Sequence, residues 1–357
     1  MEKIATSLRT MKQKIPFEAD SLKAWFLEEA RDLPWRKNPS PYAVWISEIM
    51  LQQTQVSVVE GYFQRWMQKF PTVEHLAVSS LDEVMKMWEG LGYYSRARNI
   101  HAGARFIVEN YQGIMPSTKE ELAQIKGLGP YTIGAILSFA FHQKVPAVDG
   151  NVIRVLTRYF NIADDVQKSA TLKKIWALAE GILPENKPWL IVEGLIELGA
   201  VVCKKEAQCW ACPLQQTCAA FAAGTQAELP KKGKKVEIAS LLRDVFVISH
   251  EGDLLVKKGE DGKVMAGLYE FPYTERKKGA RFPFPLKARK VSKLPEVQHS
   301  FTRYRVTLYP TVWQTEERVK IPGYEWLSWE EIERSPFSAG HRRILASLRT
   351  QNAYIAH

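Results

Sequence analysis

Four cysteines, the only ones in the 357-residue chain, gather in one short segment. Cys203, Cys209, Cys212 and Cys218 are separated by five, two and five residues. Unrelated core cysteines rarely cluster in this way, and four thiolates in one loop suit tetrahedral zinc or a [4Fe–4S] cluster. Zinc ribbons usually use two Cys-x-x-Cys pairs, whereas this segment has one pair and two outlying cysteines. The spacing therefore favours iron–sulfur.

A second pattern predicts two helices joined by a glycine turn. It runs from Leu122 through Lys126-Gly127-Leu-Gly129 to Pro130. Pro130 suits the first position of the second helix, because the N–H there has no intrahelical partner. The unpaired N–H groups of such a hairpin bind phosphate without reading base sequence. A purely structural helix–helix turn gives the same pattern, so the motif alone leaves both interpretations open.

Two carboxylates complete the set of candidate reactive groups. Asp149 stands directly before a predicted helix, where an aspartate usually acts as the N-cap. Glu48 shares a helical face with Trp45, Leu51 and Gln52. An apolar, aromatic face disfavours the charged form of a carboxyl, raises its pKa and allows it to act as an acid near neutrality. A glutamate at the edge of the face, reaching into water, is the alternative interpretation.

The composition, 46% hydrophobic and 25% charged, excludes a mainly disordered chain. The longest nearly unbroken apolar run, residues 131–141, is too short to cross a bilayer, and the N-terminus lacks a signal-peptide core. We therefore expect a cytoplasmic protein that binds no membrane. Residues 1–224 carry 25 Lys/Arg against 23 Asp/Glu, and residues 225–357 carry 24 against 16. This basic excess favours a polyanionic partner.

The candidate groups must be positioned mainly by helices, because residues 20–220 have apolar residues at helical spacing. Glycine and proline interrupt this pattern. The predicted helices are Ser21–Ala30, Val44–Phe70, Leu81–Met87, Ser95–Tyr111, Lys119–Ile125, Tyr131–Phe141, Val152–Phe160, Leu172–Ile182 and Trp189–Val202. We expect a mainly helical domain over residues 1–224, with the hairpin at 119–141 and the cysteine loop at 203–218.

The composition changes after residue 224. Residues 225–238 are polar and contain several lysines, which predicts a basic linker. Arg243–Ser249, Leu254–Lys257 and Arg303–Trp313 are rich in β-branched and aromatic residues, whereas Glu330–Ile332 and His341–Leu348 favour short helices. We expect an α+β second domain over residues 239–357.

Together these motifs closely resemble those of one family. Glu48 in Trp-Ile-Ser-Glu-Ile-Met-Leu-Gln-Gln-Thr, the Gly127–Gly129 hairpin, Asp149 in Val-Asp-Gly-Asn and the four cysteines occur in the order found in MutY-type adenine DNA glycosylases of the endonuclease III superfamily. The resemblance covers about residues 20–350. It implies a mainly α helix-hairpin-helix glycosylase domain with a [4Fe–4S] cluster on the cysteines, followed by a Nudix-like C-terminal domain.

The resemblance also implies a role for each matched position. Glu48 would be the general acid that protonates the leaving adenine, Asp149 would stabilise the positive sugar of the transition state, and Tyr131 and Asn151 would support them. The remaining positions would be Arg31, Trp35 and Glu193 at the adenine pocket, Gln53 and Tyr93 as wedges in the base stack, and Arg36, Leu51, Lys126, Gly127 and Gly129 as further substrate- or DNA-binding residues.

Tyr131 distinguishes two branches of the superfamily. Relatives that cut the DNA backbone after base removal carry a lysine at this position, and its amine forms a Schiff base. A phenol cannot form one, so the resemblance implies base excision without efficient strand cleavage. A bifunctional glycosylase and lyase, and a non-catalytic mispair-binding protein, are the alternatives.

The second domain departs from the family pattern in its details. Met265–Pro272 is similar to the family's Gly-Leu-Trp-Glu-Phe-Pro segment, but no Arg-Glu-x-x-Glu-Glu cluster follows, so we expect a reader without Nudix hydrolysis. His299-Ser-Phe301-Thr302-Arg303 stands at the family's His-x-Phe-Ser-His loop, which senses 8-oxoguanine opposite adenine. Arg303 replaces the last histidine, and an arginine can contact either a purine edge or a phosphate.

A second departure is the first cysteine spacing, which has five intervening residues where the family usually has six. The resemblance as a whole implies a monomeric base-excision enzyme. Its partner would be double-stranded DNA that contains A:8-oxoG or A:G mispairs.

Overall fold

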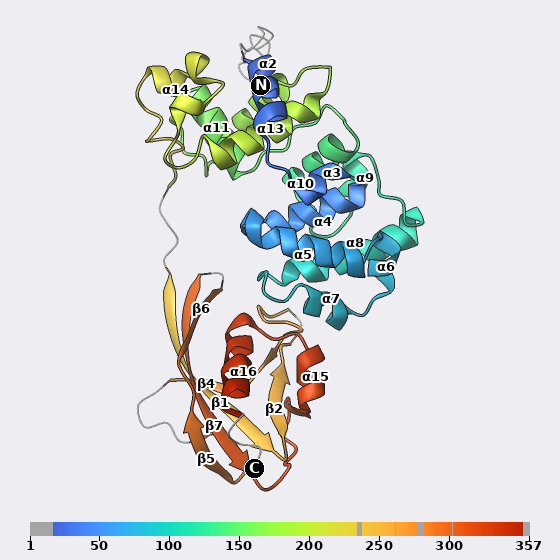
Figure 1. Ribbon diagram of the computed structural model, residues 1–357, viewed down its shortest axis with the longest axis vertical. Coiled ribbons are helices and arrows are strands. Elements are labelled where there is room, and N and C mark those ends of the chain that lie inside the picture. The colour runs from blue at the N-terminus through green and yellow to red at the C-terminus, as the bar shows by residue number, and fades with distance from the viewer. Residues whose placement is uncertain (1–16, 234–237, 261, 277–281, 302, 353–357) are drawn as a thin grey trace. The chain divides into compact units, whose positions relative to one another are not determined.

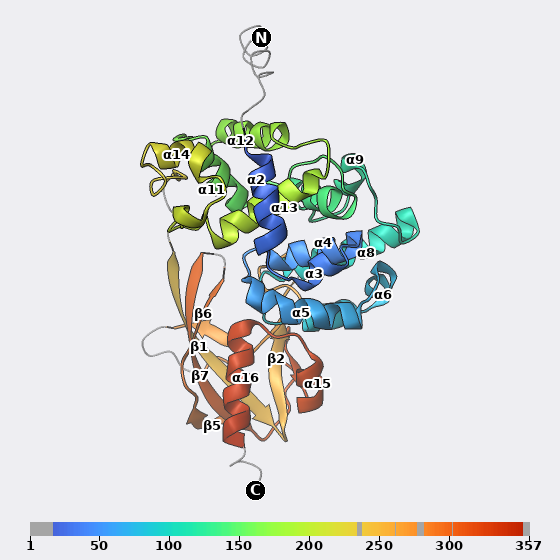
Figure 2. The ribbon, with the colours of Figure 1, turned by 45° about the horizontal axis from the view of Figure 1, so that its top comes forward.

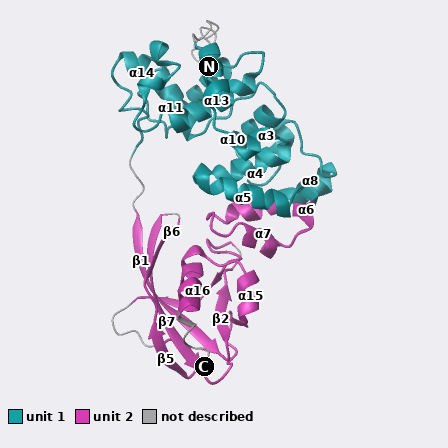
Figure 3. Ribbon diagram, viewed as in Figure 1, with its two compact units in different colours: residues 1–74, 103–234 teal, residues 75–102, 235–357 magenta. Residues whose placement is uncertain are grey.

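The computed structural model describes residues 17–233, 238–260, 262–276, 282–301 and 303–352, the side chains of 351 and 352 excepted. The chain divides into two compact units (Figure 3). The helical unit is Met1–Glu74 with Gly103–Lys234, and the mixed unit is His75–Ala102 with Lys235–His357. Helices α6 (Val73–Val78) and α8 (Ser95–Tyr111) each have residues in both units.

The described residues of the helical unit form helices and loops (Figure 1). None of the described helices is both long enough and apolar enough to span a membrane. The elements of this unit are α2 (Ala19–Glu29), α3 (Pro34–Lys37), α4 (Pro41–Leu51), α5 (Val56–Lys69), α9 (Lys119–Leu122), α10 (Pro130–Ala135), the π-helix η2 (Ile136–Ala140), α11 (Gly150–Tyr159), α12 (Ser169–Gly181), α13 (Pro188–Val201), the 3₁₀ turns η3 (Cys209–Ala211) and η4 (Gln215–Thr217), and α14 (Ala219–Ala222).

The prediction of one helix over Val44–Phe70 is wrong, because the structure has two. Helix α4 ends at Leu51 and α5 begins at Val56. Between them Gln53 adopts a left-handed conformation with φ of 59°, which ends an α-helix. No glycine or proline marks this break in the sequence. The hairpin helices are also shorter than predicted, since α9 ends at Leu122 and the second helix changes to π geometry after Ala135.

Two glycines let the helices of this unit approach one another closely. A Cβ on Gly134 of α10 would lie 2.2 Å from the carbonyl oxygen of Pro146, and a Cβ on Gly199 of α13 would lie 2.5 Å from Cβ of Asn151. Both distances are far below van der Waals contact. Glycine at these positions therefore brings α10 and α13 against the segment that enters and begins α11.

The mixed unit contains a twisted eight-stranded sheet. Its strands are β1 (Ala239–His250), β2 (Asp253–Lys258), β3 (Tyr269–Glu270), β4 (Tyr273–Glu275), β5 (Ala288–Lys293), β6 (Val297–Phe301), β7 (Tyr304–Thr315) and β8 (Glu325–Leu327). The order β3-β2-β1-β7-β5 forms the main path, while β4 pairs with β1, β6 with β7 and β8 with β2. Strands β1 and β7 are parallel, with Val247 opposite Val312, and the other named pairs are antiparallel.

Alternation along β1 separates the two faces of this sheet. Val245 and Val247 point into one core, which also takes side chains from α15 (Trp329–Arg334) and α16 (Ala339–Asn352). Figures 1 and 2 show α16 lying across this face. Phe246 and Ile248 point into a smaller cluster on the opposite face. This period of two is what a pleated strand requires.

The limits of the compact units differ from the predicted domain limits at two places. Residues 75–102, which include α7 (Leu81–Met87), group with the C-terminal residues. Residues 225–233 stay with the helical unit, where the Val166 N–H donates to the carbonyl of Lys231 at 3.1 Å and Arg158 Nε donates to that of Leu229 at 3.0 Å. The sequence predicts strands only at β1, β2 and β7, whereas β3, β4, β5, β6 and β8 are found only in the structure.

Gly134→Ala should destabilise the protein, because the added methyl group meets a backbone carbonyl that cannot move without shifting α10 or the segment before α11. We expect a loss of about 1–3 kcal/mol in the free energy of unfolding, measured by guanidinium denaturation. Gly150→Ala is the matched control, since its Cβ would meet nothing within 4 Å. Unchanged stability of Gly134→Ala would contradict the close approach.

Candidate active site

The helical unit contains a cavity of about 480 Å³ bordered by α3, α4, α10, α11 and α13. Its lining brings together residues that are distant in the sequence. Ten of the predicted site residues line it: Arg31, Trp35, Arg36, Glu48, Leu51, Gln53, Tyr131, Asp149, Asn151 and Glu193.

Glu48 is the buried carboxyl of this cavity, with an exposed fraction of 6%. Helix α4 starts at Pro41 after the N-cap Ser40, and every residue from Tyr42 to Met50 is buried. The prediction of an edge glutamate that reaches into water is therefore excluded. Burial raises the pKa of Glu48 to about 7, while the hydrogen bond from Tyr131 opposes this shift and the charge of Asp149 adds to it.

Tyr131 holds Glu48 directly. Its Oη donates a hydrogen bond to Oε2 of Glu48 at 2.5 Å. Tyr131 lies in the first turn of α10, where Gly129 is the N-cap and Pro130 occupies the first helical position. Burial raises the pKa of the Tyr131 phenol well above its ordinary value, with the Glu48 and Asp149 charges acting in the same direction. The phenol is thus a donor at neutral pH.

Asp149 combines the two roles that its sequence context allowed. It caps α11, because Oδ1 accepts from the N–H groups of Asn151 and Val152 at 2.9 and 2.8 Å. It also lines the cavity, with Oδ2 held by Asn151 Nδ2 at 2.7 Å. Burial raises the pKa of Asp149, and these hydrogen bonds oppose the rise because they stabilise the carboxylate.

Glu197 is a site residue that the sequence reading missed. It is fully buried, and its two oxygens accept from Arg31 Nε at 2.6 Å, Arg31 Nη2 at 3.0 Å and Arg36 Nη2 at 2.9 Å. Burial alone would raise the pKa of Glu197, but the two arginines outweigh it and the pKa lies below its ordinary value. The sequence contains a pattern that indicates it, because Glu193 and Glu197 stand one turn apart on the otherwise apolar helix α13.

Arg36 connects this ion pair to Glu193. Its Nε lies 3.9 Å from Oε2 of Glu193, and Nη2 binds Glu197. Burial raises the pKa of Glu193, the charge of Arg36 opposes the rise and the charge of Glu197 adds to it. Arg31, predicted at the adenine pocket, therefore also serves to compensate a buried carboxylate.

The predicted wedge residues share an unusual backbone. Gln53 and Tyr93 have φ of 59° and 46°, a region in which residues other than glycine are strained. Both are exposed, and Tyr93 has 47% of its surface accessible. Gln53 lies in the helical unit and Tyr93 in the mixed unit.

The hairpin presents Lys126 and Gly127 to solvent. Gly127 has φ of 92°, so the turn requires glycine there, and Gly129 is the N-cap of α10. These residues do not line the cavity of Glu48.

The four cysteines line one small cavity of about 30 Å³, together with Arg158 and Gln208. All four are free thiols in the structure. Arg158 is buried and fastens the loop, because Nη1 donates to Cys203 Sγ at 3.3 Å and to the carbonyl of Lys204 at 2.6 Å. Within the described ranges, no three His, Cys, Asp or Glu side chains are grouped so as to hold one metal ion.

In the mixed unit, Phe301 lines a separate cavity of about 650 Å³ with Tyr273, Tyr304 and the buried Glu270. Arg303 is exposed, and its Nη2 donates to Tyr304 Oη at 3.3 Å. Thr302, also a predicted DNA-binding residue, lies outside the described residues.

His299, a residue of β6, packs against the start of α16. A Cβ on Gly340 would lie 2.9 Å from its Nε2. Burial, followed by the charges of Arg343 and Arg243, lowers the pKa of His299 to about 4. It is a neutral, inward-facing side chain at pH 7.

Residues 46–180 match the HhH-GPD superfamily of base excision DNA repair proteins, and residues 244–347 match the NUDIX domain. The structure of a thermostable thymine-DNA glycosylase is 26% identical, with a TM-score of 0.53 over 57% of this chain and 95% of that chain. An endonuclease III–DNA covalent intermediate, 24% identical with a TM-score of 0.52 over 60% of this chain and 98% of that chain, shares the fold.

Relatives that match over most of their length agree with these matches. The adenine DNA glycosylase of Rattus norvegicus is 34% identical over 91% of this chain and 76% of its own length, and that of Homo sapiens is 33% identical over 91% and 72%. The adenine DNA glycosylase of Buchnera aphidicola subsp. Acyrthosiphon pisum is 36% identical over 72% and 74%. The predicted fold class, a helical helix-hairpin-helix domain and a Nudix-like α+β domain, is confirmed, and the chain belongs to the adenine DNA glycosylase family.

Proposed function

We propose that this protein removes adenine paired with 8-oxoguanine or guanine by acid-assisted hydrolysis of the N-glycosidic bond. The observation that carries the proposal is the buried Glu48 carboxyl, whose pKa is raised to about 7 and which shares one cavity with Asp149. A protonated acid and an anionic carboxylate on one cavity are what cleavage of a purine glycosidic bond needs. The basic charge of the chain supports a DNA partner.

Glu48 acts as the general acid in this mechanism. Its proton goes to a ring nitrogen of adenine, so that the electron pair of the breaking C1′–N9 bond leaves on a neutral base. The hydrogen bond from Tyr131 to Oε2 fixes the carboxyl and leaves Oε1 as the oxygen for the transferable proton. Water then adds to C1′ and releases a proton, which completes hydrolysis.

Asp149 stabilises the positive charge that develops on the sugar. Its carboxylate is oriented by three hydrogen bonds from Asn151 and Val152, which need not rearrange during the reaction. Asn151 is thus a supporting residue that fixes Oδ2.

The adenine binds against one wall of the cavity, which is formed by Arg31, Trp35, Arg36, Leu51 and Glu193. The base reaches it only after leaving the duplex, because its glycosidic bond is inaccessible inside the stack. The strained, exposed turns at Gln53 and Tyr93 are suited to wedge into the gap. Lys126, Gly127 and Gly129 hold phosphates through the hairpin.

The enzyme is monofunctional. A phenol at position 131 cannot form the Schiff base that a lysine would form, and Tyr131 Oη is engaged with Glu48. In the C-terminal domain, 8-oxoguanine is read by Phe301, Thr302 and Arg303. The proposal includes three segments: a glycosylase domain over residues 1–224, a linker over 225–238 and a lesion-recognition domain over 239–357. It also includes a monomeric protein in the cytoplasm.

The four thiols are not grouped around one metal position in the described residues, but their number and chemistry suit a [4Fe–4S] cluster. All four border one small cavity, and Arg158 supports the loop that carries them. Cys203, Cys209, Cys212 and Cys218 would each bind one iron atom. When bound, the cluster would cross-link the loop 203–218 at four points.

Duplexes with A:8-oxoG, A:G, A:C or thymine glycol test the activity. We expect adenine release from the first two, with strand breaks only after alkali. Breaks without alkali would indicate a lyase, and binding without adenine release would indicate a mispair-binding protein.

Glu48→Gln should abolish excision, since an amide cannot supply the proton. The expected loss in single-turnover rate is about 10²-fold or more, with the affinity for A:8-oxoG duplex retained. Glu109→Gln, an exposed glutamate of α8, is the control and should excise normally. Near-normal excision by Glu48→Gln would show that Glu48 is not the general acid.

The pH profile should follow the protonation of Glu48. The acid is active when protonated, so the single-turnover rate should fall as pH rises through the Glu48 pKa of about 7. At low pH the rate should fall again where Asp149, whose pKa is raised by burial, takes up a proton and loses its negative charge. The Tyr131 hydrogen bond lowers this pKa, so Tyr131→Phe should move the falling limb to higher pH. Tyr111→Phe, outside the cavity, should not move it, and a shift of the Tyr131→Phe limb to lower pH would contradict the account.

Purified protein should be yellow-brown, with broad absorption at about 400 nm and about four iron atoms per chain. Cys212→Ser should lose most of this colour and iron, because it removes one of four ligands. Colourless protein with one zinc per chain would show that the site is a zinc site.

A further inference from the structure

The turn that carries Tyr93 is built as a rigid element. It connects α7 to α8, and Trp88 Nε1 donates to the carbonyl of Gly92 at 3.0 Å. Arg96, 8% exposed, donates from Nη2 to the carbonyls of Leu91 and Gly92 at 2.9 and 3.1 Å. The strained backbone of Tyr93 is therefore held by side chains from the two ends of the turn, Trp88 after α7 and Arg96 on α8.

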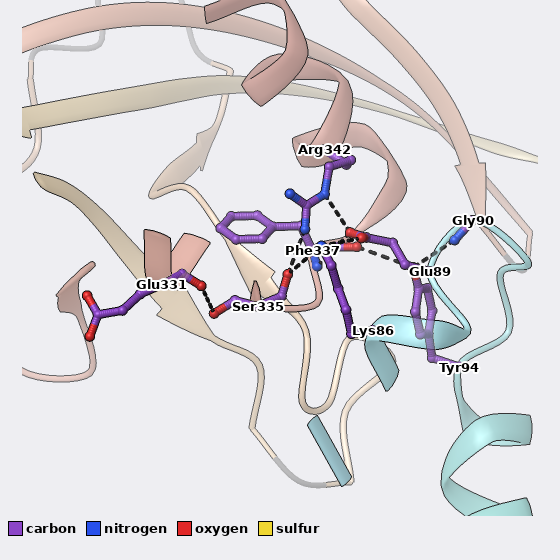
Figure 4. A network of polar contacts seen from close by, with 8 residues as sticks. All are labelled: Lys86, Glu89, Gly90, Tyr94, Glu331, Ser335, Phe337 and Arg342. Carbon is purple, nitrogen blue, oxygen red and sulfur yellow. Dashed lines mark hydrogen bonds and ion pairs between the residues drawn. The ribbon is translucent and has the colours of Figure 1, made fainter. Parts of the chain in front are cut away.

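Glu89, in the same turn, joins it to the C-terminal part of the mixed unit (Figure 4). Its Oε1 accepts from Arg342 Nε at 2.6 Å and from the N–H of Phe337 at 3.0 Å. Its Oε2 accepts from Lys86 Nζ at 2.8 Å. Only 15% of the Glu89 side chain is exposed, so these charge-assisted bonds are partly shielded from water.

Further hydrogen bonds fix the same contact. Tyr94 Oη accepts from the N–H of Gly90 and donates to the carbonyl of Phe337, both at 3.3 Å. Lys86 and Arg342 both donate to the carbonyl of Ser335, at 3.3 and 2.6 Å. Lys86 and Glu89 before Tyr93, and Tyr94 after it, are thus bonded to residues 335–342 at the start of α16.

The start of α16 also contacts β6, the strand that carries Phe301, which we propose reads the lesion. Helix α16 packs on β6, and a Cβ on Gly340 would lie 2.8 Å from the His299 ring, two residues before Phe301. A continuous path of packed groups therefore runs from Phe301 through His299 and the start of α16 to Arg342 and Glu89.

We propose that Glu89 is a positioning residue that couples lesion reading by the C-terminal domain to the wedge residue Tyr93. The inference rests on the function proposed above. Gln53, the other wedge residue, belongs to the unit of the catalytic cavity, whereas Tyr93 belongs to the unit of the lesion reader. Recognition of 8-oxoguanine therefore biases the Tyr93 turn, whereas an A:G pair presents no lesion to the reader, and its reaction does not depend on this coupling.

The test compares single-turnover rates on A:8-oxoG and A:G duplexes. Glu89→Gln should keep the A:G rate within about twofold and reduce the ratio of the two rates by about fivefold or more. A partly unfolded sample lowers both rates equally, so the ratio reports coupling and not stability. Arg342→Lys, which keeps the charge but loses the Nε contact, should reduce the ratio in the same direction.

A double-mutant cycle separates coupling from a general weakening of the contact. Glu89→Gln added to Tyr93→Ala should reduce the ratio no further than Tyr93→Ala alone, because both act through one turn. Asp82→Asn is the matched control: it breaks the exposed ion pair between Asp82 of α7 and Lys258 of β2, at 2.9 Å, and should leave the ratio unchanged.

Three outcomes would overturn the proposal. They are an unchanged ratio in Glu89→Gln, additive effects of Glu89→Gln and Tyr93→Ala, or an equal loss in Asp82→Asn. If wild-type protein releases no adenine from either duplex, the proposed function itself fails, and this result is distinct from the other three.

Discussion

Burial of the Glu48 carboxyl against Tyr131 is the constraint on which the site depends. A carboxyl in water ionises well below neutrality, and only removal from water combined with nearby negative charge brings its pKa to about 7. The phenol of Tyr131 satisfies one oxygen at 2.5 Å, so the buried acid has a partner without being forced to ionise. The remaining features of the helical unit maintain this balance.

Close backbone packing and a buried ion pair maintain the environment of Glu48. Gly134 and Gly199 allow backbone approach that no larger residue permits, and this brings Tyr131, Asp149 and Asn151 to one cavity. Glu197 is fully buried, and its negative charge is neutralised by ion pairs with Arg31 and Arg36. The negative charges that raise the pKa of Glu48 come from Asp149 and Glu193, which line the same cavity.

The sequence predicted most of the fold and the reactive groups, because their signals are local. Helical spacing, the Gly-x-Gly hairpin and the clustered cysteines are patterns within a few residues of one another. Glu197 was missed because its importance comes from Arg31 and Arg36, more than 160 residues away. The break at Gln53 and the network of Glu89 with Arg342 depend likewise on backbone strain and distant contacts, which no short pattern records.

The protonation state of Glu48 is the most direct measure of the central claim. Carbon-13 NMR of protein labelled at glutamate carboxyls would follow its titration, with the resonance assigned by its absence in Glu48→Gln. The account predicts a midpoint of about 7, so that the carboxyl is substantially protonated at neutral pH. A midpoint at or below the ordinary value of 4.5 would mean that Glu48 is ionised there and cannot be the acid.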